Sequence, residues 1–129
     1  MNQLEVLLVE NKEAEHLKEN INRILKRYEV NITQARDYRQ LRTHLETGRY
    51  DIAFIDCDFG GDWRVDVVQT TRLIDELQPS CVKVIMSIMP KSLFPDYFGS
   101  IAQICTDKQT LRTYPHQIAK ELQKYGFNR

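Results

Sequence analysis

The chain has 129 residues, which suits a single domain spanning residues 1–129 and is long enough to bury a hydrophobic core. Lys plus Arg and Asp plus Glu both number 18, so the formal net charge is zero, which argues against direct nucleic-acid binding through a basic excess. No apolar run approaches the roughly 20 residues that span a bilayer, and the first residues lack the basic segment and cleavage site of a signal peptide. We therefore expect a cytoplasmic protein without membrane insertion.

The N-terminal part alternates between apolar runs and helical spacing. Leu4–Val9 is short and almost entirely apolar, which predicts a buried parallel strand. From Ala14 to Tyr28 the apolar residues recur at spacings of three and four, which is typical of one face of a helix. Val30 and Ile32 then alternate with polar residues and predict a short second strand.

The middle of the chain repeats this pattern. Asp37 is a suitable N-cap for a second helix, and Gly48 is placed to end it. Asp51–Asp56 is apolar through its middle and predicts a third strand. The loop that follows contains Gly60–Gly61, which gives the backbone the freedom to turn. A third helix is expected from about residue 65 to Leu77, with Leu77 among its inward-facing residues.

The C-terminal part is the least regular. Val82–Ser87 predicts a fourth strand. Residues 89–100 contain two prolines, which forbid one long helix, so a short or distorted helix is expected there. Ala102–Thr106 predicts a fifth strand, and one last helix is expected from about residues 110–114 to Tyr125.

Strands that alternate with helices along the whole chain indicate the α/β class. Such a pattern predicts a parallel sheet with helices on both faces, and right-handed crossovers leave few topologies for it. We therefore predict a flavodoxin-like, doubly wound, five-stranded parallel sheet with the strand order 2-1-3-4-5.

Acidic residues stand at the ends of two strands that this order makes neighbours. Glu10 ends the first strand and Asp56 ends the third, at the switch point where ligands bind in such sheets. Ser87 ends the fourth strand on the other side of Asp56, and the backbone carbonyl of Asp58 is expected to face the same pocket. Clustered carboxylates repel each other and attract a hard cation, and oxygen ligands with open positions suit Mg²⁺.

These residues resemble the receiver domain of two-component response regulators, along nearly the whole chain. LEVLLVEN is similar to the family's first strand with its terminal acidic pair, DIAFID to the strand that ends in the phosphoacceptor Asp, and VIMS to the strand that ends in Ser or Thr. The resemblance implies that Asp56 accepts a phosphoryl group from a sensor histidine kinase or a phosphotransfer protein. It implies Mg²⁺ as cofactor, held by Asp56, the pair Glu10–Asn11 and the carbonyl of Asp58.

The resemblance also implies a signalling mechanism. The acyl phosphate would recruit the Ser87 hydroxyl and reshape the face formed by the fourth helix, the fifth strand and the fifth helix, where a downstream protein partner would bind. Assembly into a homodimer is left open.

Several departures from the family pattern surround this pocket. Asn11 replaces a carboxylate, which predicts weaker Mg²⁺ binding, and Ile88 stands where a small residue is usual. Counting back from the last helix places Asp107 where the family has a conserved Lys, and Lys108 follows it. Because side chains alternate along a strand, Lys108 should point away from Asp56 unless a bulge or one-residue shift turns it.

Three functions follow for this divergent sequence. The first is a receiver phosphorylated on Asp56, with Lys108 as a displaced partner. The alternative is a phosphorylation-independent pseudo-receiver that acts as a protein–protein interaction module. The third, a flavodoxin-like cofactor binder or enzyme, is disfavoured because the loop ENKEAEH after the first strand lacks the Ser, Thr and Gly residues that cradle a flavin phosphate.

Overall fold

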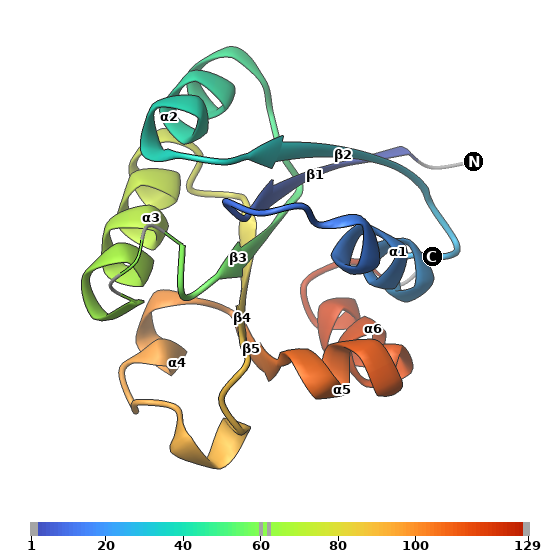
Figure 1. Ribbon diagram of the computed structural model, residues 1–129. Helices are drawn as coiled ribbons and strands as arrows, with labels where there is room; N and C mark the ends of the chain where they lie inside the picture. The colour runs from blue at the N-terminus through green and yellow to red at the C-terminus, as the bar shows by residue number, and fades with distance from the viewer. Residues whose placement is uncertain (1–2, 60, 62, 128–129) are drawn as a thin grey trace.

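The apolar runs form a five-stranded, all-parallel sheet with the order β2-β1-β3-β4-β5, as predicted. The computed structural model describes residues 3–59, 61 and 63–127. Helices alternate with the strands along the chain (Figure 1). In chain order the elements are β1 (Gln3–Val9), α1 (Glu15–Ile24), β2 (Glu29–Ala35), α2 (Tyr38–Thr47), β3 (Ile52–Asp56), α3 (Trp63–Leu77), β4 (Val82–Ser87), the 3₁₀ turn η1 (Lys91–Leu93), α4 (Phe98–Ile101), β5 (Ile104–Asp107), α5 (Lys108–Thr113) and α6 (Pro115–Gln123).

Helices cover both faces of the sheet. Figure 1 shows α2 and α3 on one face and α1, α5 and α6 on the other. Every residue of β3 and β4 is buried, as expected for central strands that are packed on both faces. None of the helices in the described part of the chain is long and apolar enough to cross a membrane.

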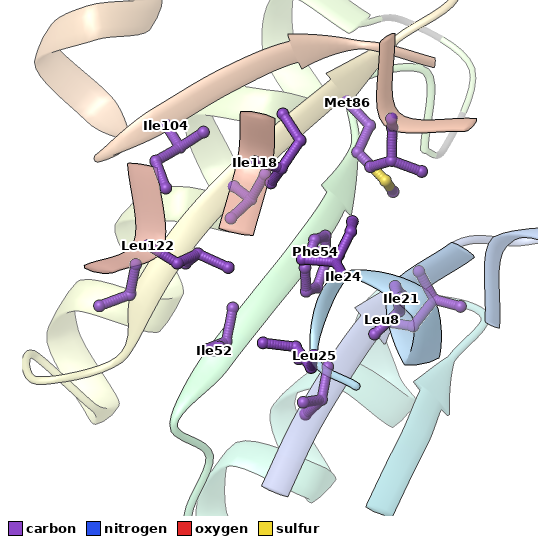
Figure 2. Close-up of a cluster of buried hydrophobic side chains, with 14 of the residues drawn as sticks. Leu8, Ile21, Ile24, Leu25, Ile52, Phe54, Met86, Ile104, Ile118 and Leu122 are labelled. Carbon is purple, nitrogen blue, oxygen red and sulfur yellow. The ribbon is translucent and has the colours of Figure 1, made fainter. Parts of the chain in front are cut away.

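The two faces of the sheet carry separate hydrophobic clusters, because successive side chains on a strand point to opposite faces. Beneath α1 and α6, Phe54 and Leu8 meet Ile21, Ile118 and Leu122 (Figure 2). On the opposite face, alternate residues of the same strands pack against α2 and α3; these buried residues include Leu7, Ile55, Leu41, Leu45 and Ile74. This packing fixes the strand register on which the site described below depends.

Local signals fix the bounds of the second helix. The carboxylate of Asp37 accepts the backbone N–H of Gln40 at 2.8 Å, as expected of an N-cap. Gly48 is the C-cap. In the loop after β3, Gly61 has a φ of +113°, which glycine adopts without strain; Gly60, expected to contribute to the same turn, lies outside the described residues.

Three expectations about the helices and strands are wrong in detail. The single last helix that was predicted is two helices, α5 and α6. Tyr114 leaves the helical conformation (φ −127°, ψ 59°), because the residue before a proline, here Pro115, is disfavoured in that conformation. Leu77 is 37% exposed rather than inward, since it is the last residue of α3. The fifth strand begins at Ile104, two residues later than predicted, and ends at Asp107, one residue later than predicted.

The segment between β4 and β5 is irregular, as its prolines predict. It contains only the turn η1 and the single helical turn α4, and Figure 1 shows it looping away from the sheet. Phe98 anchors it, being buried with its ring centroid 5.4 Å from that of Phe94.

Candidate functional site

The parallel register brings Glu10 and Asp56 together. Val9 pairs with Ile55 across β1 and β3, so the next residue of each strand stands at the same edge of the sheet. Both acidic residues are 5% exposed, although a carboxylate is costly to bury without a partner. The two carboxyl groups are hydrogen-bonded to each other. The first prediction about the pocket, that these two carboxyls converge, is therefore confirmed.

Lys108 is the cationic partner of this pair. Its Nζ atom lies 3.0 Å from Oδ2 of Asp56 and 3.8 Å from Oε2 of Glu10. Lys108 does not point away as strict strand alternation would require; the allowed exception of a shift in the strand end applies, because the strand stops at Asp107 and Lys108 is the first residue of α5. Strand alternation therefore no longer governs its direction.

Asp107 does not face the pocket, contrary to the expectation that it takes the place of the family's lysine. Its carboxylate accepts the backbone N–H of Thr110 at 2.7 Å and thereby caps α5. A capping carboxylate at this helix start is turned toward the backbone of the helix.

The three charges shift the pKa values of the two acids in opposite directions. Burial raises the pKa of Glu10 to about 7, and the neighbouring Asp56 carboxylate adds to the rise. Burial also acts to raise the pKa of Asp56, but the hydrogen bonds from Glu10, the Asp58 N–H and Lys108 outweigh it, and the net pKa is lowered. Below about pH 7 Glu10 is mostly protonated and donates to the ionised Asp56, whose charge Lys108 balances.

Gln34 holds the loop that follows Glu10, a role that the sequence did not reveal. Its Nε2 donates to the carbonyls of Glu10 at 2.7 Å and Lys12 at 2.8 Å. The N–H of Lys12 in turn donates to Oε1 of Glu10 at 3.1 Å. The only signal in the sequence for this contact was a polar residue near the end of β2. Gln34 pairs with Leu8 of the neighbouring strand β1, two residues before Glu10.

Asp58 contributes its backbone rather than its side chain. The Asp58 N–H donates to Oδ1 of Asp56 at 3.0 Å, and Asp58 itself is an exposed residue. The Asp58 carbonyl accepts the N–H of Gly61 at 3.4 Å, which leaves it a second lone pair. Asn11 is exposed beside the pocket.

Ser87 stands in the neighbouring strand, buried at the end of β4. Its Oγ accepts the N–H of Met89 at 3.0 Å, which ties the start of the next loop to the strand. Burial raises the pKa of the adjacent Cys57 thiol, and a hydrogen bond with Ser87 offsets part of that rise. Ile88, between Ser87 and Met89, is 78% exposed.

The donor set suits a hard cation but is small. Within residues 3–59, 61 and 63–127 no three His, Cys, Asp or Glu side chains gather closely enough to hold a metal ion. The oxygen donors that do converge are the carboxyls of Glu10 and Asp56. Oxygen ligands of this kind fit Mg²⁺, which retains several waters and needs few protein ligands.

No family model matches the sequence, and no curated protein matches it significantly. Solved structures do match over nearly the whole chain. A response regulator from Thermotoga maritima has a TM-score of 0.72 and 15% identity, covering 95% of this chain and 97% of its own. The T. maritima response regulator TrrA, solved with Mg²⁺ and BeF, has a TM-score of 0.68 and 13% identity, covering 97% and 99%.

A third match is the RcsB response regulator of Salmonella typhimurium, with a TM-score of 0.74 and 19% identity. The alignment covers 96% of this chain but 61% of the RcsB chain. At such identities the likeness concerns the fold, and the same fold recurs in receiver domains from Methanospirillum hungatei and Pseudomonas fluorescens. The chain therefore has the fold of response regulator receiver domains.

Proposed function

We propose that this chain is a receiver of two-component signalling that accepts a phosphoryl group on Asp56. The observation that carries the proposal is the ion pair between Lys108 and Asp56, 3.0 Å apart at the carboxyl ends of the strands. A buried carboxylate that is kept ionised and paired with one cation is a suitable acceptor, because catalysis of phosphoryl transfer consists mainly of positioning and charge neutralisation.

In the proposed reaction an oxygen of Asp56 forms a bond to the phosphorus of a phosphohistidine, or of a small acyl phosphate, as the donor's bond to phosphorus breaks. The lowered pKa of Asp56 keeps this carboxylate unprotonated and nucleophilic. Lys108 remains beside the product and balances part of the added negative charge.

Glu10 and Asp56 would hold Mg²⁺, together with the amide oxygen of Asn11 and the carbonyl of Asp58. When bound, the ion would neutralise charge on the transferred phosphoryl group. Glu10 must lose its proton to serve as a ligand, since its pKa is raised to about 7. Replacement of a family carboxylate by Asn11 leaves one negative charge fewer, so the affinity for Mg²⁺ would be modest.

The proposed output is a movement of the β4–α4 loop. Ser87 already contacts this loop through the N–H of Met89. A phosphoryl group on Asp56 would compete for the Ser87 hydroxyl and shift the segment from η1 to α4 against β5 and α6. A downstream protein partner would read that shift.

A pseudo-receiver remains the second candidate, and one observation favours it. The pocket's own side chains balance its charge, because Glu10 is hydrogen-bonded to Asp56 and Lys108 pairs with both. A pocket balanced in this way would not need a phosphoryl group to complete it, and the chain would then act as a protein–protein interaction module.

Labelling by a small acyl-phosphate donor with Mg²⁺ separates the two candidates. The wild-type chain should gain one phosphoryl group, seen by intact-protein mass spectrometry, and Asp56→Asn should gain none. Asp58→Asn is the matched control, since it removes the same charge from an exposed side chain two residues away and leaves its backbone N–H in place. Unlabelled wild type at high Mg²⁺ would favour the pseudo-receiver.

A further inference from the structure

A groove lies between the end of α1 and α6, at the opposite end of the sheet from Asp56. The chain leaves α1 at Ile24 and enters β2 at Glu29, which pairs with Gln3 at the start of β1. The residues between α1 and β2 therefore lie at the amino ends of the strands, whereas Asp56 lies at a carboxyl end (Figure 1). A ligand held by these residues would leave Asp56 accessible.

The floor of this groove is apolar. The groove has a volume of about 690 Å³, and its lining includes the buried side chains of Ile24 and Leu25. Gly126, with a φ of +99°, turns the chain after α6, and the N–H of Phe127 then donates to the carbonyl of Leu122 at 3.2 Å. Phe127 is thereby placed against the core between α1 and α6. The volume lies within the range of clefts that hold organic ligands or side chains of a partner.

The rim of the groove is cationic. Arg23, Lys26 and Arg27 come from the end of α1 and the turn after it, and Lys120 comes from α6; all four are exposed. No Asp or Glu is among the described residues that line the groove. None of the four cations has an ion-pair partner in the described part of the chain. In a chain of zero net charge this is a local excess of positive charge around an apolar hollow.

We propose that this groove binds an acidic amphipathic helix of a protein partner. The apolar floor offers a site for the hydrophobic face of a helix. The unpaired cations on the rim offer partners for carboxylates that flank that face. Nucleic acid is the less suitable occupant, because its affinity comes from many phosphate contacts along a basic surface rather than from an apolar hollow. The proposal does not depend on phosphorylation of Asp56.

The test measures binding of a fluorescein-labelled helical peptide that carries Leu along one face and Glu on the other positions, by fluorescence anisotropy. The reference peptide has Lys in place of every Glu. The wild-type chain should bind the Glu peptide at least about tenfold more tightly than the Lys peptide, and added salt should weaken the binding. The double variant Arg23→Glu/Arg27→Glu should lose at least about tenfold in affinity for the Glu peptide.

Arg39→Glu/Arg49→Glu is the matched control. It makes the same change in net charge at exposed positions on and just after α2, which covers the other face of the sheet, and it should bind like the wild type. Asp56→Asn should also bind like the wild type, so that failure here is distinct from failure of the proposed phosphorylation. Equal binding of the two peptides, equal binding by both double variants, or tighter binding of a single-stranded oligonucleotide or anionic vesicles would overturn the proposal.

Discussion

The ammonium group of Lys108 contacts the carboxylate of Asp56 at 3.0 Å, although the two residues are 52 positions apart in the sequence. The contact depends on β5 ending at Asp107, because that lets the first residue of α5 extend toward β3. The strand register places Asp56 opposite Met86 and Ser87 opposite Asp107, so β4 separates the strands that carry the two charges. Asp56, the Ser87 hydroxyl and Lys108 therefore lie at the carboxyl ends of three adjacent strands, with Lys108 directly after β5.

Lys108→Met should slow phosphorylation of Asp56 by at least about tenfold under Mg²⁺. Two unit charges about 4 Å apart interact by roughly 4 kcal/mol at an effective dielectric constant near 20, and partial exposure of Lys108 reduces that figure. The rate of labelling by the acyl-phosphate donor is the measurement. Lys124→Met, at an exposed position after α6, should label at the wild-type rate. Equal rates for the two variants would mean that Lys108 does not assist the reaction.

Glu10 should make the stability of the metal-free protein depend on pH. Its pKa is raised from 4.5 to about 7 in the folded protein, so the folded state binds more protons than the unfolded state between these values. The stabilisation from protonated Glu10 is present below pH 4.5 and is lost as the pH rises through about 7. The free energy of unfolding should fall by on the order of 2 kcal/mol over this interval.

Glu10→Gln isolates that effect, since the amide keeps a hydrogen-bond donor toward Asp56 but does not titrate. Urea unfolding at a series of pH values with a chelator present should show a flatter profile for the variant. Asp56 has the opposite effect because its pKa is lowered in the folded protein. Its contribution to stability is present above its ordinary pKa and is lost as the pH falls through the lowered pKa of the folded state. Parallel profiles for wild type and variant would contradict the protonated state assigned to Glu10.

Asp107→Ala should affect stability and leave phosphorylation unchanged. Loss of the N-cap of α5 should cost about 1 kcal/mol, whereas Asp107→Asn keeps an acceptor for the Thr110 N–H and should cost less. Chemical denaturation gives the stability, and acyl-phosphate labelling gives the activity. Clearly faster labelling of Asp107→Ala would show that this carboxylate does oppose the phosphoryl group.

Asp75→Asn should destabilise the protein through a different ion pair. Lys83 on β4 is buried, and its ammonium group contacts the half-exposed carboxylate of Asp75 on α3. Removal of the carboxylate leaves a buried cation without its partner, which should cost roughly 2 kcal/mol once partial exposure of Asp75 is allowed for. Glu76→Gln, the same charge change at the next, exposed position, should cost less than about 0.5 kcal/mol in urea unfolding.

The sequence predicted the strand order and the meeting of Glu10 with Asp56 because both depend on simple periodicity. An apolar run bounded by polar residues marks a buried strand, and parallel strands bring their carboxyl ends to one edge. The cap at Asp37 was equally local and was confirmed.

The sequence was less informative where one residue changes the outcome. The direction of Lys108 depends on whether the strand stops before or after it, and strand ends cannot be located that closely from apolar pattern alone. Gln34 contacts the carbonyls of Glu10 and Lys12, which lie more than 20 residues away in the sequence, and no local pattern encodes that contact. The break before Pro115 could not be predicted because proline is compatible with two structures. It can lie in the first turn of a continuing helix, or it can begin a new helix after another has ended.

Localising the phosphoryl group tests most directly whether Asp56 is the phosphoacceptor. After reaction with the acyl-phosphate donor and Mg²⁺, borohydride reduction converts an aspartyl phosphate to homoserine, and peptide mass spectrometry gives its position. We expect homoserine at position 56, dependent on Mg²⁺ and strongly reduced in Lys108→Met. Absence of homoserine at position 56 in the wild type, or modification at another position instead, would contradict that role of Asp56.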